Sequence, residues 1–183
     1  MIKSYFSLTK PKVVVLLQIT ALCSVLSHDL LEQYNFSFQQ VIETSMKMLV
    51  VFIGGYLTAG GANAINMWYD RDIDPIMRRT SNRAIPSGRV SPNNALLFGV
   101  FISIIGVVWF AVMANQVAAF WAAFSIIFYV FIYTAWLKRS TVQNIVIGGI
   151  AGSTPPVIGW AAASDDLSIK TDSVIKFFDS IFS

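Results

Sequence analysis

Three oxygen-bearing side chains recur at intervals of four residues near the end of a long apolar run. They are Asn66, Asp70 and Asp74, within the stretch Asn-Met-Trp-Tyr-Asp-Arg-Asp-Ile-Asp. If the stretch is helical, this spacing places them along one face, each about 6 Å beyond the last. Hard oxygen ligands suit Mg²⁺, which in turn suits phosphate groups. The spacing therefore predicts a metal site in which these three residues hold Mg²⁺ and act in chemistry on a phosphorylated substrate at a membrane surface.

Basic residues follow the acidic ones within the same loop. They are Arg71, Arg78, Arg79, Arg83 and Arg89. In a site for a metal-bound diphosphate, carboxylates hold the cation and guanidinium groups neutralise phosphate oxygens. The alternative is an ordinary loop whose arginines set membrane topology and whose aspartates balance them. Asp72 falls on another helical face, so we expect it to be solvated or paired with an arginine.

The composition indicates an integral membrane protein. Of the 183 residues, 55% are hydrophobic and 13% are charged, and the mean hydropathy is +0.63. Soluble domains carry about 25% charged residues, whereas here the apolar residues fall in blocks near the ~20 residues that cross a bilayer. The net charge of +3 is too small and dispersed to indicate nucleic-acid binding. The predicted fold class is all-α, a polytopic membrane helical bundle forming one domain over residues 1–163.

Five membrane-spanning helices are expected. Their approximate ranges are 11–27, 46–69, 94–114, 117–136 and 142–163. We interpret the first as a membrane helix and not a signal peptide, because no convincing small-residue cleavage site follows it. Pro155 and Pro156 should break the fifth helix and open a pocket wall. Residues 164–183 are expected to form a polar or interfacial tail, or the beginning of a further part of a longer chain.

The loops alternate in charge. The N-terminus, the arginine-rich loop and the turn holding Lys138 and Arg139 are basic, whereas the other connections are acidic or neutral. By the positive-inside rule, the N-terminus and the acidic motif are cytoplasmic and the chain is a multi-pass protein of the cell membrane. Lys47 is an exception at the outer start of the second helix, where we expect it to snorkel to the interface. His28, in the outer loop, is expected to be a solvated surface residue.

Several segments resemble one family. The Asn66, Asp70 and Asp74 spacing looks like the first aspartate-rich motif of the UbiA-type intramembrane prenyltransferases. The wider sequence is similar to their protoheme IX farnesyltransferase (heme O synthase) branch. The segments that carry this similarity are Leu8-Thr-Lys-Pro-Lys-Val, Asn66 to Asp74 continuing to Arg89, Tyr133-Thr134, Lys138-Arg139, and Asn144 to Ala162. Together they cover most of residues 1–163.

The resemblance implies about nine helices and a second aspartate-rich motif, which this sequence does not contain. The chain therefore looks like the N-terminal half to two-thirds of such a protein. We expect the remainder to be absent from this sequence, lost from the gene, or supplied by a second chain.

The resemblance also implies a reaction and the residues for it. Farnesyl diphosphate would donate its prenyl group to a vinyl group of heme b, giving heme O, with Mg²⁺ at the acidic motif. The residues that would bind substrate are Arg78, Arg79, Arg83, Tyr133, Lys138 and Arg139. Two alternatives remain open: another acceptor, such as a quinone precursor or glycerol phosphate, and a noncatalytic membrane remnant.

Polar and aromatic side chains inside the spans have simpler interpretations. Gln18 and Asn63 are expected to form hydrogen bonds between helices, with substrate contact a secondary option for Asn63. Most aromatic residues of the fourth helix should face lipid or the interface. The glycines of the second and fifth helices should allow close helix packing, or leave room for a prenyl chain.

Overall fold

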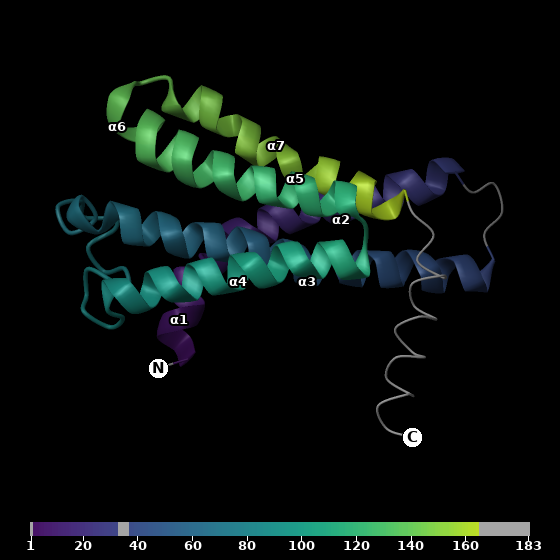
Figure 1. Ribbon diagram of the computed structural model, residues 1–183, viewed down its shortest axis with the longest axis horizontal. Coiled ribbons are helices and arrows are strands. Elements are labelled where there is room, and N and C mark those ends of the chain that lie inside the picture. The colour runs from purple at the N-terminus through teal and green to yellow at the C-terminus, as the bar shows by residue number, and fades with distance from the viewer. Residues whose placement is uncertain (1, 33–36, 165–183) are drawn as a thin grey trace.

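The computed structural model describes residues 2–32 and 37–164, and every regular element within these ranges is helical. Figure 1 shows the long helices side by side along the longest axis, with α1 set at an angle to them. The helices are α1 (Ile2–Leu8), α2 (Pro11–Glu32), α3 (Phe38–Tyr69), the 3-10 turn η1 (Asp70–Asp72), α4 (Pro92–Met113), α5 (Gln116–Ile127), the π-helix η2 (Phe128–Leu137), α6 (Lys138–Ser140) and α7 (Asn144–Ala163).

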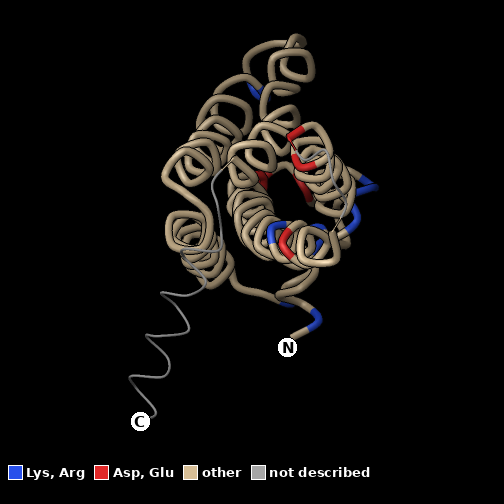
Figure 2. Tube along the Cα trace, turned by 90° about the vertical axis from the view of Figure 1, so that its right-hand side faces the viewer, with Lys and Arg blue, Asp and Glu red and all other residues tan. Residues whose placement is uncertain are grey.

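Five of these segments are long and apolar enough to cross a membrane, as the sequence predicted. α5, η2 and α6 together make the fourth of them. Viewed from one end of the molecule, most of the chain trace carries neither acidic nor basic residues (Figure 2). The first two spans are longer than predicted, because α2 continues to Glu32 and α3 begins at Phe38. Ser37 and Gln40 start α3 with a capping box, in which each residue's side chain accepts from the other's amide.

Glycines set how closely the helices approach. A Cβ added to Gly61 would lie 2.1 Å from Ser103 Oγ of α4, and one added to Gly159 would lie 2.3 Å from the Ala21 carbonyl oxygen of α2. No side chain fits in either place, so α3 packs on α4, and α7 on α2, backbone to backbone. Gly149 and Gly152 differ, since an added Cβ would meet nothing within 4 Å. The sequence predicted both behaviours, close packing and open room.

The expectation that two prolines break the last helix is wrong. α7 runs without interruption through Pro155 and Pro156. Pro155 has no amide hydrogen to donate to the Ala151 carbonyl, but the Thr154 hydroxyl donates to that oxygen at 2.8 Å. Inside a membrane, such a side-chain bond satisfies a carbonyl that a proline would leave unpaired.

The π-helix η2 was not predicted, and it changes which residues share a face. Its Thr134 hydroxyl donates to the Tyr129 carbonyl five residues earlier. In an α-helix, Lys138 would lie about 180° around the axis from Tyr129, at 3.6 residues per turn. The wider π turn brings Tyr129, Thr134 and Lys138 round to the same side. π segments of this kind often occur at functional sites.

The far end of the bundle holds a buried ion pair. Lys47 Nζ lies 3.0 Å from Asp29 Oδ1 and donates to the Ala163 carbonyl at 3.1 Å. His28 Nδ1 also lies 3.0 Å from Asp29 Oδ1, and its ring meets Trp160 edge-on. The expectations that Lys47 snorkels and that His28 is solvated are therefore wrong, because both side chains are drawn in by the buried Asp29 carboxylate. The predicted tail lies outside the described residues beyond Ser164.

Candidate active site

The acidic motif stands where α3 ends. Asn66 is in the last turn of α3, and Asp70 begins η1. The helical expectation fails beyond Tyr69, yet the Asp74 amide still donates to the Asp70 carbonyl at 2.9 Å. All three predicted ligands are buried, with exposed fractions of 3%, 0% and 0% for Asn66, Asp70 and Asp74.

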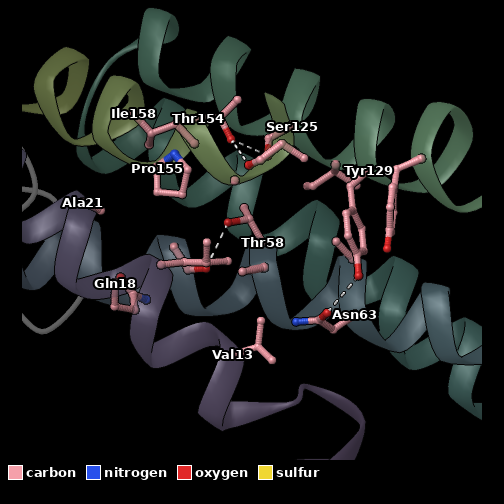
Figure 3. A pocket seen from close by; sticks show the side chains of 18 of the residues that line it. Val13, Gln18, Ala21, Thr58, Asn63, Ser125, Tyr129, Thr154, Pro155 and Ile158 are labelled. Atoms are coloured by element: carbon pink, nitrogen blue, oxygen red, sulfur yellow. Dashed lines mark hydrogen bonds between the residues drawn. The ribbon is translucent and has the colours of Figure 1, made fainter. Parts of the chain in front are cut away.

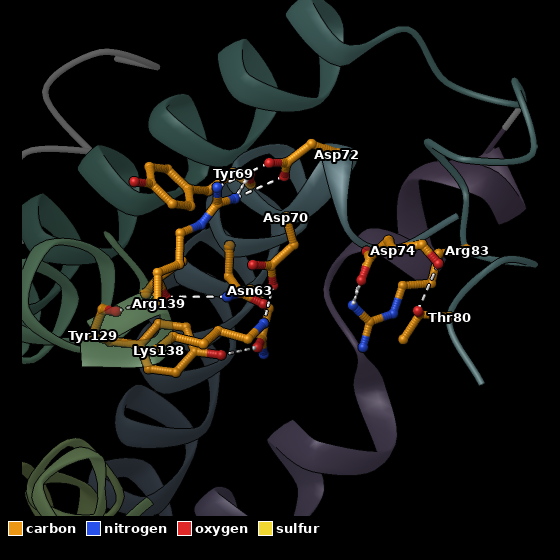
Figure 4. A network of polar contacts seen from close by, with 12 residues as sticks. Asn63, Tyr69, Asp70, Asp72, Asp74, Thr80, Arg83, Tyr129, Lys138 and Arg139 are labelled. Atoms are coloured by element: carbon orange, nitrogen blue, oxygen red, sulfur yellow. Dashed lines mark hydrogen bonds and ion pairs between the residues drawn. The ribbon is translucent and has the colours of Figure 1, made fainter. Parts of the chain in front are cut away.

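Each of the three predicted ligands contacts a basic side chain from a different part of the chain. Lys10 donates to Asn66 Oδ1 at 2.5 Å, and Lys138 forms an ion pair with Asp70. Arg83 Nη1 donates to both oxygens of Asp74, at 2.8 and 2.9 Å. Figure 4 shows the Asp70 and Asp74 carboxylates in separate ion pairs. Buried carboxylates are tolerated because these cations compensate them.

The described side chains supply only part of the oxygen ligands that Mg²⁺ needs. Asp70 Oδ1 is buried and has no hydrogen-bond partner among the described residues, so one hard oxygen is available for a cation. In the described part of the chain, no three His, Cys, Asp or Glu side chains come together in a way that would hold a metal. Asn66, Asp70 and Asp74 are the residues that would hold Mg²⁺ here.

Lys10 is a site residue that the sequence analysis missed. It lies between α1 and α2 with φ 50°, a left-handed conformation that is rare for a residue other than glycine. Burial, with Arg83 nearby, lowers the pKa of Lys10 to about 7. Lys10, Arg83 and Lys138 thus surround two buried carboxylates, an arrangement with an excess of basic groups that favours an anion.

The predicted substrate residues other than Tyr133 fall into three groups. Arg83 and Lys138 lie at the motif, as described above. Arg78 and Arg79 are exposed in the loop. Arg139 pairs with both oxygens of Asp72 at 2.7 and 2.9 Å and lies over the Tyr69 ring, so the prediction that Asp72 is solvated or pairs with an arginine is confirmed.

Buried hydrogen bonds connect the motif to the neighbouring helices. Asn66 Nδ2 donates to Thr134 Oγ1 at 3.1 Å, and Asn63 Nδ2 donates to the Thr9 carbonyl at 3.1 Å. The Tyr129 hydroxyl donates to Asn63 Oδ1 at 3.4 Å. The interhelical role predicted for Asn63 is confirmed. Thr134 belongs to a segment that resembles the family, but its bond to Asn66 and the position of Tyr129 could not be predicted, because both depend on the π turn.

An apolar cavity begins at Asn63, about one helical turn before Asn66 of the motif, and extends into the bundle. Its volume is about 350 Å³, and it is lined by α2, α3, α5, η2 and α7 together with Phe110 of α4. Figure 3 shows Tyr129 and Asn63 toward one end, and Ala21 and Ile158 toward the other. Tyr133 lines it too, stacked on Tyr129 with ring centroids 5.3 Å apart. Gln18, whose Nε2 donates to the Phe52 carbonyl, also faces this space.

Long apolar helices and a charged, oxygen-rich site beside an apolar cavity define an integral membrane protein of the helical class. The sequence profile of the UbiA prenyltransferase family matches residues 37–178. The chain belongs to this family.

Curated relatives agree with this assignment. A protoheme IX farnesyltransferase of Bartonella henselae is 43% identical over 91% of this chain and 50% of its own length. Proteins of the same name from Rhodopseudomonas palustris and Chloroflexus aurantiacus are 46% and 44% identical over 92% of this chain, and over 50% and 27% of their own lengths. The chain thus spans about half the length of the Bartonella henselae and Rhodopseudomonas palustris proteins and a smaller part of the Chloroflexus aurantiacus protein. No solved structure matches it, and these comparisons give no support to a second chain that supplies the remainder.

Proposed function

We propose that the protein transfers a farnesyl group from farnesyl diphosphate to a vinyl group of heme b, giving heme O. The observation that carries this proposal lies at one end of the bundle. Buried Asp70 has one unpartnered oxygen and pairs with Lys138, while Lys10 and Arg83 contact Asn66 and Asp74 of the same motif. Asn63, one turn before Asn66, lines the apolar cavity. The names of the curated relatives support the same donor and acceptor.

The charged end would bind the diphosphate. Asn66, Asp70 and Asp74 would hold Mg²⁺, which when bound supplies charge neutralisation for the leaving diphosphate. Lys10 donates to Asn66 Oδ1 and Lys138 to Asp70 Oδ2, so Asp70 Oδ1 is the oxygen that these two cations leave free for the metal. We infer that both ammonium groups turn from these oxygens to the phosphate oxygens when substrate binds, so that no buried charge is left unpaired.

The four predicted arginines would bind the diphosphate at different distances from the motif. Arg78 and Arg79 are exposed and would attract the diphosphate from solution. Arg83 would then contact it at the motif. Arg139 is held on Asp72 and Tyr69, and would contribute through its charge at the rim of the site.

The chemistry consists of bond cleavage followed by capture of a cation. The C–O bond of the donor breaks with both electrons leaving on the diphosphate, which produces an allylic cation. The π electrons of the heme vinyl group form the new C–C bond, and water adds to the resulting cation and loses a proton. The faces of Tyr129 and Tyr133 would stabilise the allylic cation through their ring quadrupoles, and the apolar cavity would exclude water until the acceptor is in place.

The motif would act on the cytoplasmic side of the cell membrane. The contact between Lys10 and Asn66 and the ion pair between Lys138 and Asp70 bring the N-terminal segment, the arginine-rich loop and the end of η2 to the same end. These are the basic segments, which the positive-inside rule places in the cytoplasm.

The test is an assay on membranes that contain the full product of the gene. Heme b, farnesyl diphosphate and Mg²⁺ are added, and heme O is detected by its mass. Parallel reactions replace heme b with a quinone precursor or glycerol phosphate. Formation of heme O alone supports the proposal, whereas prenylation of another acceptor in place of heme, or no product in any reaction, contradicts it.

A further inference from the structure

We propose that Thr134 is a positioning residue of the site, which holds the amide of Asn66 so that its oxygen, and not its nitrogen, is offered to the metal. The inference rests on the proposed function, because it takes Asn66 as a ligand of Mg²⁺. An asparagine amide carries an oxygen at one end and an NH₂ group at the other, and Mg²⁺ binds the oxygen. A neighbouring group must therefore determine which end of the amide faces the charged residues.

The Thr134 hydroxyl is placed to accept from Asn66. A hydroxyl has one hydrogen to donate, and this one is donated to the Tyr129 carbonyl at 2.8 Å. The Asn66 nitrogen then donates to Thr134 Oγ1 at 3.1 Å. If the amide were reversed, its oxygen would face a hydroxyl oxygen whose hydrogen is already used. The direction of one hydrogen bond thus sets the direction of the next.

The π-helix supplies the acceptor for the Thr134 hydroxyl. This hydroxyl bonds the carbonyl five residues earlier, whereas threonines in α-helices bond the carbonyl three or four residues earlier. The wider repeat of η2 brings the Tyr129 carbonyl within reach of the Thr134 side chain. The π turn therefore orients the amide of a residue that lies 68 positions away in the sequence.

Burial and the contact with Lys10 make this orientation matter. Thr134 and Asn66 are 0% and 3% exposed, so bulk water does not compete for the amide. Lys10 donates to Asn66 Oδ1 at the other end of the amide, and an ammonium group has only donors. A cationic group therefore already lies at this oxygen. Under the proposed function Lys10 turns away to phosphate, and of these two contacts the one with Thr134 remains to direct the oxygen.

The experiment measures binding of inorganic diphosphate by the full product of the gene in detergent, as a function of Mg²⁺ concentration. Thr134→Val removes the hydroxyl and keeps a branched side chain of similar shape. The Mg²⁺ concentration for half-maximal binding should rise about tenfold, because the amide nitrogen loses its buried acceptor. Thr134→Ser keeps the hydroxyl and should bind as wild type does. If Thr134→Val does not fold, Thr134→Ala removes the same hydroxyl and carries the same expectation.

Two further variants distinguish positioning from packing. In an Asn66→Ala background there is no amide to orient, so the addition of Thr134→Val should cause no further loss. Thr58→Val is the matched control, since Thr58 is also a buried threonine whose hydroxyl donates to a carbonyl of its own helix, that of Gly54 at 2.9 Å. This control should keep the Mg²⁺ dependence of wild type.

The outcomes separate the inference from the function on which it rests. If Mg²⁺ does not strengthen diphosphate binding by wild type, or if Asn66→Ala binds as wild type does, the proposed metal site fails. If Asn66→Ala weakens binding while loss of the Thr134 hydroxyl leaves it unchanged, the inference alone is overturned. It is also overturned if the loss caused by Thr134→Val persists in the Asn66→Ala background, or if Thr134→Ser or Thr58→Val causes an equal loss.

Discussion

At the scale of single residues, the site pairs every predicted metal ligand with a base. Asn66 contacts Lys10, Asp70 pairs with Lys138, and Asp74 pairs with Arg83. Leaving one partner of a buried ion pair without the other costs several kcal/mol. Under the proposed function, substrate binding would be an exchange of partners, in which Lys10 and Lys138 turn from Asn66 and Asp70 to phosphate oxygens and leave these ligands free to hold Mg²⁺.

Lys10 provides a test of this exchange. Replacing it with alanine removes a charged donor worth about 1.5–3 kcal/mol, so KM for farnesyl diphosphate should rise about tenfold to a hundredfold. The steady-state kinetics of heme O formation measure the effect. Lys12→Ala is the control, since Lys12 is exposed two residues away. Equal effects of the two substitutions would show that only the general positive charge of this segment matters.

The sequence could reveal some of these residues but not others. The spacing of Asn66, Asp70 and Asp74 is local, so it is visible in the chain, and Arg83 follows within the same loop. The Lys10 contact joins residues 56 positions apart. This contact depends on a left-handed backbone conformation at a lysine, which no sequence pattern predicts.

At the scale of elements, two kinds of local feature allow the helices to pack around the site. Side-chain hydroxyls satisfy carbonyls that helical bonding leaves free, as Thr154 does before Pro155. Glycines allow backbones to meet, as Gly159 does against Ala21. The sequence predicted that two adjacent prolines would break α7, because proline removes an amide donor, but the preceding threonine supplies a replacement. The π register of η2 could not be predicted, since its residues are equally compatible with an α-helix.

Two glycines of α7 should respond oppositely to the same substitution. Gly159→Ala places a Cβ against the α2 backbone and should destabilise the protein by about 1–3 kcal/mol through overpacking. Gly152→Ala meets no neighbour and should be neutral or raise stability by up to about 1 kcal/mol, because alanine favours the helix. Thermal unfolding in detergent measures both. A loss of stability for Gly152→Ala equal to that for Gly159→Ala would contradict the packing described for α2 and α7.

At the scale of the whole molecule, the bundle has two distinct ends. One carries the motif and its bases, and the other carries the buried pair of Asp29 and Lys47. The five spans could be predicted because apolar blocks of membrane length stand out in composition. Their boundaries could not be predicted, since α3 begins at Phe38, after a capping box at Ser37 and eight residues before the predicted span.

The orientation of the two ends can be measured with cysteine labels. In a Cys23→Ser background, Ser87→Cys marks the motif end and Gln39→Cys marks the opposite end, and both positions are exposed. A membrane-impermeant maleimide applied to intact cells should label the cysteine at 39, but label the one at 87 only after permeabilisation. The reverse pattern would place the motif outside and contradict the proposed orientation.

The central claim is that the oxygens at the end of α3 hold a metal-bound diphosphate, and equilibrium binding of inorganic diphosphate tests it most directly. Wild-type protein should bind diphosphate with Mg²⁺ and lose at least tenfold in affinity when Mg²⁺ is removed with a chelator. Asp70→Asn should lose a similar factor in the presence of Mg²⁺. The exposed Asp72, paired with Arg139, gives the control Asp72→Asn, which should bind as wild type does. Diphosphate binding by Asp70→Asn that equals wild type and still depends on Mg²⁺ would contradict the claim.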